Sequence, residues 1–293
     1  MELWIPITIV AAILQNVRSS LQKYLKGQLS TNGATVSRFL FGFPVALAIL
    51  AVLAAGQTIP QVNAEFLIFM IIGGLAQIFA TSLLLYSFSL RNFAVGTAFS
   101  KTEVIQAAVF GIVVLGDQIS FLSLLAICVS FAGIILLTSH QSLRGGIFNL
   151  SAGVGLLCGA LFGVAAVAYR AASLALPTGD YLLRAATTLA FVICFQTLVM
   201  LIWLALREPG QIIKVLKSWR VSGLVGIAGS LASLGWFAAM TLQNAAFVKA
   251  LGQVEMLFTV FVSVVYFRER PSLRESLGII LTTLGIVLLL LWR

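Results

Sequence analysis

Charged residues are scarce in this sequence. Only 9% of its 293 residues are Asp, Glu, Lys or Arg, whereas 60% are hydrophobic. A soluble domain usually carries about 25% charged residues and needs them to cover its surface. Lipid tails, in contrast, accept apolar side chains on the outside of a protein. The composition therefore excludes an ordinary soluble fold and predicts an integral membrane protein whose partner is the lipid bilayer.

Histidine and cysteine are also rare. His140 is the only histidine, and Cys128, Cys158 and Cys194 all lie inside apolar segments without a CxxC pair. This pattern argues against a metal site or a disulfide framework, and we expect no cofactor. The net charge of +9 is not accompanied by a stretch of interleaved basic and aromatic residues. Nucleic acid is therefore not an expected partner.

Motifs of catalysis and of ATP use are missing as well. The chain contains no HExxH, no GxSxG, no aspartate-rich pair and no GxxxxGK[ST] sequence. An intramembrane protease or transferase would need such groups, and ATP-driven transport would need the last of them. We therefore expect a protein that is not an enzyme. Its N-terminus, Met1 to Trp4, lacks a basic region and a cleavage site, and we interpret it as the start of the first span.

Long apolar runs are what the sequence does have. A membrane-spanning helix needs about 20 mostly apolar residues. The segments that qualify are 3–24, 34–55, 64–89, 93–115, 119–138, 150–175, 180–206, 221–242, 246–267 and 272–292. They lack the period-two alternation of barrel strands. The sequence predicts an all-α membrane protein of ten transmembrane helices joined by short turns.

Lysine and arginine are distributed unevenly between the turns. The odd-numbered gaps, beginning with the gap between spans 1 and 2, hold the basic residues Lys23, Lys26, Arg91, Arg144, Arg207, Lys214, Lys217, Arg220, Arg268, Arg270 and Arg274. Basic loops stay in the cytoplasm, so this bias predicts both termini outside it. Arg170 and Arg184, which flank the gap between spans 6 and 7, count against this orientation.

The two halves of the chain repeat each other. A shift of 152 positions superimposes like residues in the pairs Arg18 and Arg170, Asn92 and Asn244, Glu103 and Glu255, Asp117 and Glu269, Ser120 and Ser272, and Gly133 and Gly285. Arg38 and Arg184 also correspond if the first gap is six residues shorter in the second half. A chain with so few charges would rarely match at four charged positions by chance. Because five spans is an odd number, the second copy starts on the opposite side of the membrane, which predicts two inverted five-helix repeats, 1–145 and 146–293.

Two segments of the chain share a pattern. They are Gly116-Asp117-Gln118-Ile119-Ser120 with Gly133, and Arg268-Glu269-Arg270-Pro271-Ser272 with Gly278 and Gly285. This pattern resembles the ends of the repeats in EamA-type transporters of the drug/metabolite transporter superfamily. Glu103 and Glu255 match an acidic residue that these proteins often carry fourteen positions earlier. Here Val104 and Met256 replace a proline that commonly follows it, and Asp117 replaces the usual Glu. The resemblance implies that the first four helices of each repeat line a central cavity. It also implies that Asp117, Ser120, Glu269 and Ser272 lie at turns and cap the fifth helix of each repeat.

Charged and polar side chains inside the spans are the candidate site. A charge at the bilayer centre costs about 2.5–3.5 kcal/mol on insertion scales, so it needs a partner or a wet cavity. Glu103 and Glu255 lie about 15 Å from the starts of their spans, near mid-membrane. Gln15, Arg18 and Gln22 share one helical face. The predicted cavity residues are Gln15, Arg18, Gln22, Arg38, Lys101, Glu103, Arg170, Arg184, Trp236, Lys249, Gln253 and Glu255. Structural ion pairs for the glutamates and snorkelling for the arginines remain open alternatives.

Inverted repeats and buried charges together favour a secondary transporter or facilitator of the cell inner membrane that works by alternating access. Basic residues outnumber acids six to two in the predicted spans, which favours an amino acid or an organic anion as the small-molecule substrate. Export of drugs or amphipathic cations is one alternative. A membrane protein with a structural or sensory role and no transport is another. The sequence leaves the direction of transport, proton coupling through Glu103 or Glu255, and a homodimer open.

Overall fold

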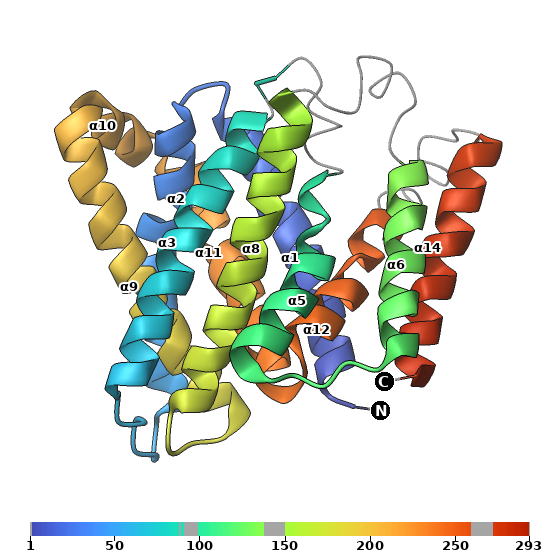
Figure 1. Cartoon of the computed structure of the whole chain (residues 1–293). Coiled ribbons are helices and arrows are strands. Elements are labelled where there is room, and N and C mark those ends of the chain that lie inside the picture. The colour runs from blue at the N-terminus through green and yellow to red at the C-terminus, as the bar shows by residue number, and fades with distance from the viewer. Residues whose placement is uncertain (1, 88, 91–98, 138–149, 259–271, 293) are drawn as a thin grey trace.

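The described part of the chain is mostly helical. The computed structural model describes residues 2–87, 89–90, 99–137, 150–258 and 272–292, and this part of the chain contains no β-strand. Its helices are α1 (Trp4–Leu25), α2 (Thr31–Leu53), α3 (Ala64–Ser87), α5 (Glu103–Leu115), α6 (Phe121–Leu137), α8 (Leu150–Ala175), α9 (Tyr181–Arg207), α10 (Pro209–Lys217), α11 (Trp219–Leu242), α12 (Ala245–Gly252) and α14 (Leu273–Trp292). α1 begins and α14 ends at the same end of the molecule (Figure 1).

The helices have the length and surface of membrane-spanning segments. Within the described residues, α2, α3, α8, α9 and α11 are long and apolar enough to cross a bilayer. Large apolar side chains are exposed on the outer surface, among them Phe121, Leu206 and Leu273, which are 72%, 76% and 87% exposed. This apolar exterior fits lipid as the surrounding solvent. The prediction of an all-α membrane protein is confirmed, and the count of ten spans stays a prediction.

Helices of the two halves interleave rather than form separate bundles. α3 packs along α8 and α1 packs along α11, and these two pairs exchange when spans 1–5 are swapped for spans 6–10. The pairs α2–α9 and α6–α14 each map onto themselves under the same exchange. Alanine is the commonest residue in the buried core of the molecule, which also contains many larger apolar side chains such as Tyr169 and Trp236. The packing therefore has the approximate two-fold pattern expected of two related repeats.

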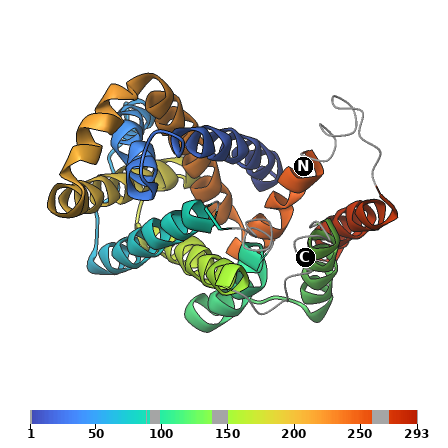
Figure 2. The ribbon, with the colours of Figure 1, turned by 90° about the horizontal axis from the view of Figure 1, so that it is seen from above.

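α6 and α14 form a pair that stands apart from the other helices (Figure 2). Small residues let their backbones touch: a Cβ atom on Gly133 would lie 2.4 Å from the backbone nitrogen of Thr282. A Cβ atom on Gly285 would lie 2.4 Å from the backbone nitrogen of Ser130. Close backbone approach through small residues is the usual way in which helices associate in lipid. Ser120 caps α6 by accepting a hydrogen bond of 3.0 Å from the backbone nitrogen of Ser123, as the resemblance implies.

Two of the predicted continuous spans are interrupted. The predicted span 93–115 breaks at a turn over Lys101 and Thr102, and α5 begins directly after it at Glu103. The predicted span 246–267 breaks at Gln253, after which the chain is helical again over 254–258. Residues 101 and 253 are equivalent in the two repeats, since they are 152 positions apart. Hydropathy alone could not detect these breaks, because the residues around them remain mostly apolar.

A further difference lies between spans 7 and 8, where a simple gap was expected. The structure has the short helix α10 there, with Pro209 at its first position and Lys214 and Lys217 in its last turn. Glu208, just before it, accepts hydrogen bonds from Ser30 Oγ (2.5 Å) and Asn32 Nδ2 (2.7 Å) at the start of α2. Several sequence-based predictions lie outside the described residues, namely the 145/146 boundary, Asn92 and the 268–271 motif.

Candidate functional site

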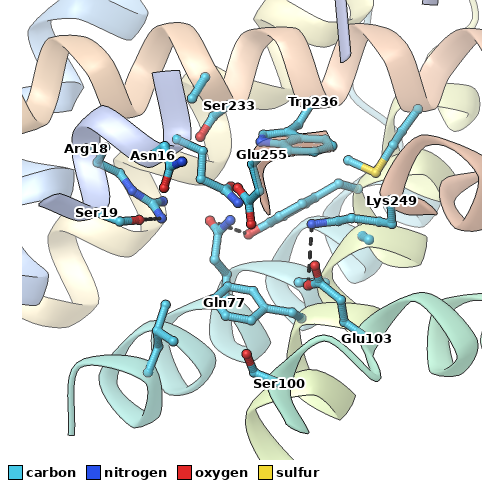
Figure 3. Close-up of a pocket in the computed structure, with 18 of the residues that line it drawn as sticks. Asn16, Arg18, Ser19, Gln77, Ser100, Glu103, Ser233, Trp236, Lys249 and Glu255 are labelled. Atoms are coloured by element: carbon cyan, nitrogen blue, oxygen red, sulfur yellow. Dashed lines mark hydrogen bonds and ion pairs between the residues drawn. The ribbon is translucent and has the colours of Figure 1, made fainter. Parts of the chain in front are cut away.

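A cavity of about 200 Å³ lies among the interleaved helices. This exceeds by far the roughly 10–15 Å³ that a single water needs. Its walls come from both halves of the chain. The lining residues are Gln15, Asn16, Arg18, Ser19, Arg38, Gln77, Leu84, Ser100, Lys101, Glu103, Phe162, Ala165, Ala166, Tyr169, Ala232, Ser233, Trp236, Phe237, Met240, Lys249, Glu255 and Met256. Figure 3 shows the polar members of this set facing one another.

The helix breaks place both glutamates at the cavity. Glu103 is the first residue of α5, because the helix restarts after the turn at Lys101 and Thr102. Glu255 lies in the first turn of the helical segment that follows Gln253. The first turn of a helix carries partial positive charge from unpaired N–H groups, which favours a carboxylate there. In each half of the chain, therefore, a helix break is followed by a glutamate in the first helical turn, and that glutamate lines the cavity.

Each glutamate pairs with a lysine from the other half. Lys101 forms an ion pair and hydrogen bond with Glu255. Lys249 Nζ lies 3.6 Å from Glu103 Oε2, and the four side chains are 10–13% exposed. A buried ion contributes little net stability when paired, but it is costly when its partner is removed. The two pairs therefore tie the halves of the molecule together across the cavity.

Aromatic rings border the Lys249 pair. Lys249 Nζ lies 4.7 Å from the ring centroid of Trp236 and 5.9 Å from that of Phe162, within the range of cation–π attraction. Gly252 makes room for the indole, since a Cβ atom there would lie 2.4 Å from Trp236 Cη2. The indole Nε1 is buried and has no hydrogen-bond partner within the described residues. It is a free donor in the wall of the cavity.

Two arginines form the opposite end of the cavity. Arg18 of α1 donates to Ser19 Oγ (3.1 Å), and its Nε atom has no partner within the described residues. Arg38 of α2 donates to Thr81 Oγ1 (3.4 Å) and Ser233 Oγ (3.1 Å). Both arginines are only 4% exposed. In Figure 3, Arg18 lies at one end of the view, and Lys249 with Glu103 at the other.

A network of neutral polar groups lies between the charged ends. Tyr169 Oη donates to the carbonyl oxygen of Gly73 (2.9 Å) and lies 3.0 Å from Gln77 Oε1. Gln196 Nε2 contacts Gln77 Oε1 (2.9 Å) and Tyr169 Oη (3.2 Å). Gln77 and Gln196 are single amides in otherwise apolar helices. The rule that found the charged residues, a polar group at membrane depth, also applies to these amides, but our prediction omitted them.

Eight of the twelve predicted site residues line the cavity: Gln15, Arg18, Arg38, Lys101, Glu103, Trp236, Lys249 and Glu255. The other four do not. Gln22 is turned toward α2, where it donates to the carbonyl oxygen of Ala34 (3.0 Å). Arg184 donates to the carbonyl oxygen of Gly179 (2.9 Å) in the turn before α9, and Gln253 is buried at the helix break. A substrate-binding role for any of the twelve stays a prediction.

Arg170, the fourth, belongs to a separate cluster near the end of α8. It donates to the carbonyl oxygens of Met240 (2.6 Å) and Gln243 (2.5 Å), and it lies 3.6 Å from Asp117. Asp117 thus pairs with α8, and Ser120 rather than Asp117 caps α6. Burial raises the pKa of the Asp117 carboxyl above its usual value, and the charge of Arg170 acts against that rise. The cluster joins the two halves of the chain at the end where α8 finishes.

Several lining residues escaped the sequence analysis. Ser19, Ser100 and Ser233 are too common in membrane helices to single out by type. Ala165, Ala166 and Ala232 carry no chemical signal at all. They line the cavity because small side chains leave space between helices. Within the described residues, no group of three or more His, Cys, Asp or Glu side chains is placed to hold a metal ion.

The sequence profile of the EamA-like transporter family matches this chain twice, over residues 2–139 and again over residues 150–291. The chain belongs to the EamA-like transporter family. Its two matches agree with the two-repeat pattern seen in the sequence and in the packing. Membership identifies a transporter of the drug/metabolite type, which acts on small molecules within a membrane. The family resemblance proposed from the Asp117 and Glu269 segments is confirmed.

This EamA protein was also compared with curated sequences and with solved structures. No curated protein sequence matches it significantly. A solved structure described only as a crystal structure of a protein superimposes with a TM-score of 0.72 at 18% identity, over 99% of this chain and 97% of the other. Such a likeness shows that the two share a fold over their whole lengths.

Proposed function

We propose that this EamA protein is a secondary transporter or facilitator that carries a small polar metabolite across the inner membrane by alternating access. In this proposal the chain has ten spans in two inverted repeats, 1–145 and 146–293, with both termini outside the cytoplasm. The observation that carries it is the cavity of about 200 Å³ lined by charged groups of both halves. A site at the interface of two repeats can open to either side when one repeat rocks against the other.

The ion pairs between the halves support this mechanism. Lys101–Glu255, Lys249–Glu103 and Arg170–Asp117 each join one repeat to the other. Contacts of this kind can separate and re-form when the repeats move as rigid bodies. Basic residues outnumber acidic ones four to two in the described lining, which supports an organic anion or an amino acid as the substrate. Proton coupling, if present, would use Glu103 or Glu255.

Export of amphipathic cations is the second candidate. Trp236, Phe162 and the two glutamates could stabilise a cation. Both carboxylates, however, already pair with lysines, which weakens this alternative.

Solute flux into proteoliposomes that hold the pure protein tests the proposal. We expect uptake of a radiolabelled organic anion or amino acid that saturates with concentration and accelerates when unlabelled solute is preloaded on the opposite side. Empty liposomes are the control. The absence of flux for organic anions, amino acids and lipophilic cations alike would leave a structural or sensory role as the better reading. A matching pH dependence in wild type, Glu103→Gln and Glu255→Gln would contradict proton coupling.

A further inference from the structure

The two arginines at one end of the cavity share a single wall. Arg18 comes from α1 and Arg38 from α2, and both pack on Gly229 of α11. A Cβ atom on Gly229 would lie 3.2 Å from Arg38 Cγ and 3.4 Å from Arg18 Cδ. The glycine therefore lets both long side chains cross the face of α11. Two like charges are held near each other inside the protein.

No carboxylate among the described residues lies within ion-pair distance of either guanidinium. Their polar contacts are with the hydroxyls of Ser19, Thr81 and Ser233. Glu255 attracts Arg18 from a longer distance, but it is already paired with Lys101. A buried ion without a counter-charge is strongly unfavourable, and arginine stays protonated in proteins. The site is therefore short of negative charge.

The whole cavity has the same imbalance. Four basic side chains, Arg18, Arg38, Lys101 and Lys249, and two acidic ones, Glu103 and Glu255, line it, so two positive charges are in excess. The buried groups that lack partners in the wall, Arg18 Nε and Trp236 Nε1, are both hydrogen-bond donors. A complementary ligand must supply acceptor oxygens and two negative charges. An amino acid zwitterion would leave both excess charges uncompensated.

We propose that the cavity takes a doubly negative oxyanion, a small dicarboxylate or a phosphate monoester, and that Arg18 and Arg38 together bind one of its anionic groups. This inference rests on the proposed transport function and names the substrate class. Guanidinium groups bind carboxylate and phosphate through paired hydrogen bonds, so two of them can surround one oxyanion. The acceptor oxygens at the other end of the ligand meet Trp236 Nε1 and the ammonium group of Lys249.

Ligand binding by the purified wild-type protein is the first test. Melting temperatures in detergent are measured with succinate, glycerol phosphate, lactate, glycine and tetraphenylphosphonium at equal ionic strength. A ligand that binds the folded state raises the melting temperature according to its dissociation constant. We expect succinate or glycerol phosphate to bind at least tenfold more tightly than lactate and glycine. The ratio of the dissociation constants of succinate and glycerol phosphate shows whether dicarboxylates or phosphate monoesters are the preferred class. Equal or tighter binding of lactate, glycine or tetraphenylphosphonium would overturn the inference.

Variants locate the binding site. We expect Arg18→Gln and Arg38→Gln each to raise the dissociation constant of the preferred dianion at least tenfold. Arg207→Gln serves as control, because Arg207 is exposed at the end of α9 and stacks on Trp203. Arg18→Lys and Arg38→Lys keep the charge and should bind dianions more weakly than wild type but still in preference to glycine. Unchanged dianion binding in the folded glutamine variants overturns the assignment, and if these variants do not fold, the lysine variants and the wild-type series decide.

Flux separates this inference from the proposed function. If proteoliposomes transport a zwitterion or a cation while dianions neither bind nor move, the protein is a transporter and the dianion inference is wrong. If dianions bind with the expected preference but no solute crosses the membrane, the binding site stands and the transport function is wrong.

Discussion

The two lysine–glutamate pairs at the cavity are the residues whose energetics can be tested most directly. Each lysine–glutamate pair joins two helices that are far apart in the chain, and each side chain is almost buried. Removal of one partner leaves the other charge in a poorly solvated place, whereas removal of both leaves none. The energy of a pair is therefore measurable only by changing its members singly and together.

A double-mutant cycle on Glu103 and Lys249 tests the ion pair between the halves. We expect Glu103→Gln to lower the free energy of unfolding by about 1–3 kcal/mol, since the ammonium group of Lys249 loses its counter-charge and keeps the aromatic neighbours Trp236 and Phe162. Adding Lys249→Gln should recover part of that loss. Thermal unfolding of the detergent-solubilised variants provides the measurement. Strictly additive effects of the two substitutions would show that the pair is not energetically coupled.

The hydroxyl of Tyr169 gives a second prediction at this scale. Tyr169→Phe removes a donor whose acceptor, the carbonyl oxygen of Gly73, is buried in the wall between α3 and α8. Gly73 lies inside α3, so its carbonyl oxygen keeps the bond within that helix and the variant loses one buried hydrogen bond. Such a bond contributes about 0.5–1.5 kcal/mol, so the melting temperature should fall. Tyr24→Phe is the matched control, because Tyr24 is 61% exposed, and it should be neutral. Equal melting temperatures for the two variants would contradict the assigned hydrogen bond.

The sequence identified all six charged residues that line the cavity in the described part of the chain, but not how they pair. A charge within an apolar run is visible in one dimension, which is why Arg18, Arg38, Glu103 and Glu255 could be selected. Pairing depends on which helices touch. Lys101 and Glu255 are 154 positions apart, and nothing in their local sequence indicates that they meet. Arg170 looked equivalent to Arg18, yet its partners are Asp117 and two backbone carbonyls at the end of α8.

At the scale of helices, hydropathy located the apolar segments well but did not detect the two helix breaks within them. The break at Lys101 and Thr102 has no proline or glycine to mark it. The break at Gln253 follows Gly252, whose small size also admits the Trp236 ring. Other helices pack closely at both breaks, with Gly159 of α8 against Thr102 and Trp236 of α11 against Gly252. Such contacts between distant segments cannot be recognised in a single sequence. α10 escaped because its nine residues are too short and too polar for a span.

The α6–α14 pair offers a sharp test of helix packing. Gly133→Ala adds a Cβ atom that would lie 2.4 Å from the Thr282 backbone nitrogen, so we expect a loss of about 1–3 kcal/mol from overpacking. Gly153→Ala is the control, because a Cβ atom on Gly153 of α8 meets nothing within 4 Å. Alanine favours a helix over glycine by about 0.5–1 kcal/mol, so the control should gain stability. Equal shifts in melting temperature for both variants would contradict the close contact.

For the whole molecule, the pattern of helix contacts links the fold to transport. Helices of the two repeats pack on each other in several pairs, among them α3–α8 and α1–α11. In the proposed mechanism, a movement of one half relative to the other would change these contacts together. In this structure, Arg170 links Asp117 to the end of α11 through the carbonyls of Met240 and Gln243. Arg18, its equivalent in the first half, lines the cavity instead. The two ends of the molecule therefore differ although the sequence repeats.

This difference predicts how the conformational equilibrium responds to Asp117→Asn. In the proposed alternating-access mechanism, loss of the Asp117 charge weakens the Arg170 cluster, which joins the two halves. The change should therefore favour a conformation in which the halves are separated at that end. Cysteine probes at Ser173 and Ser19, each in a chain whose native cysteines are replaced by serine, report the two ends. Ser173 is fully buried beside the cluster, and Ser19 lines the cavity. In Asp117→Asn, labelling by a membrane-impermeant maleimide should rise at position 173 and fall at position 19. A rise at 173 without a fall at 19 would indicate local loosening instead of alternating access, because a two-state transporter that opens one end must close the other.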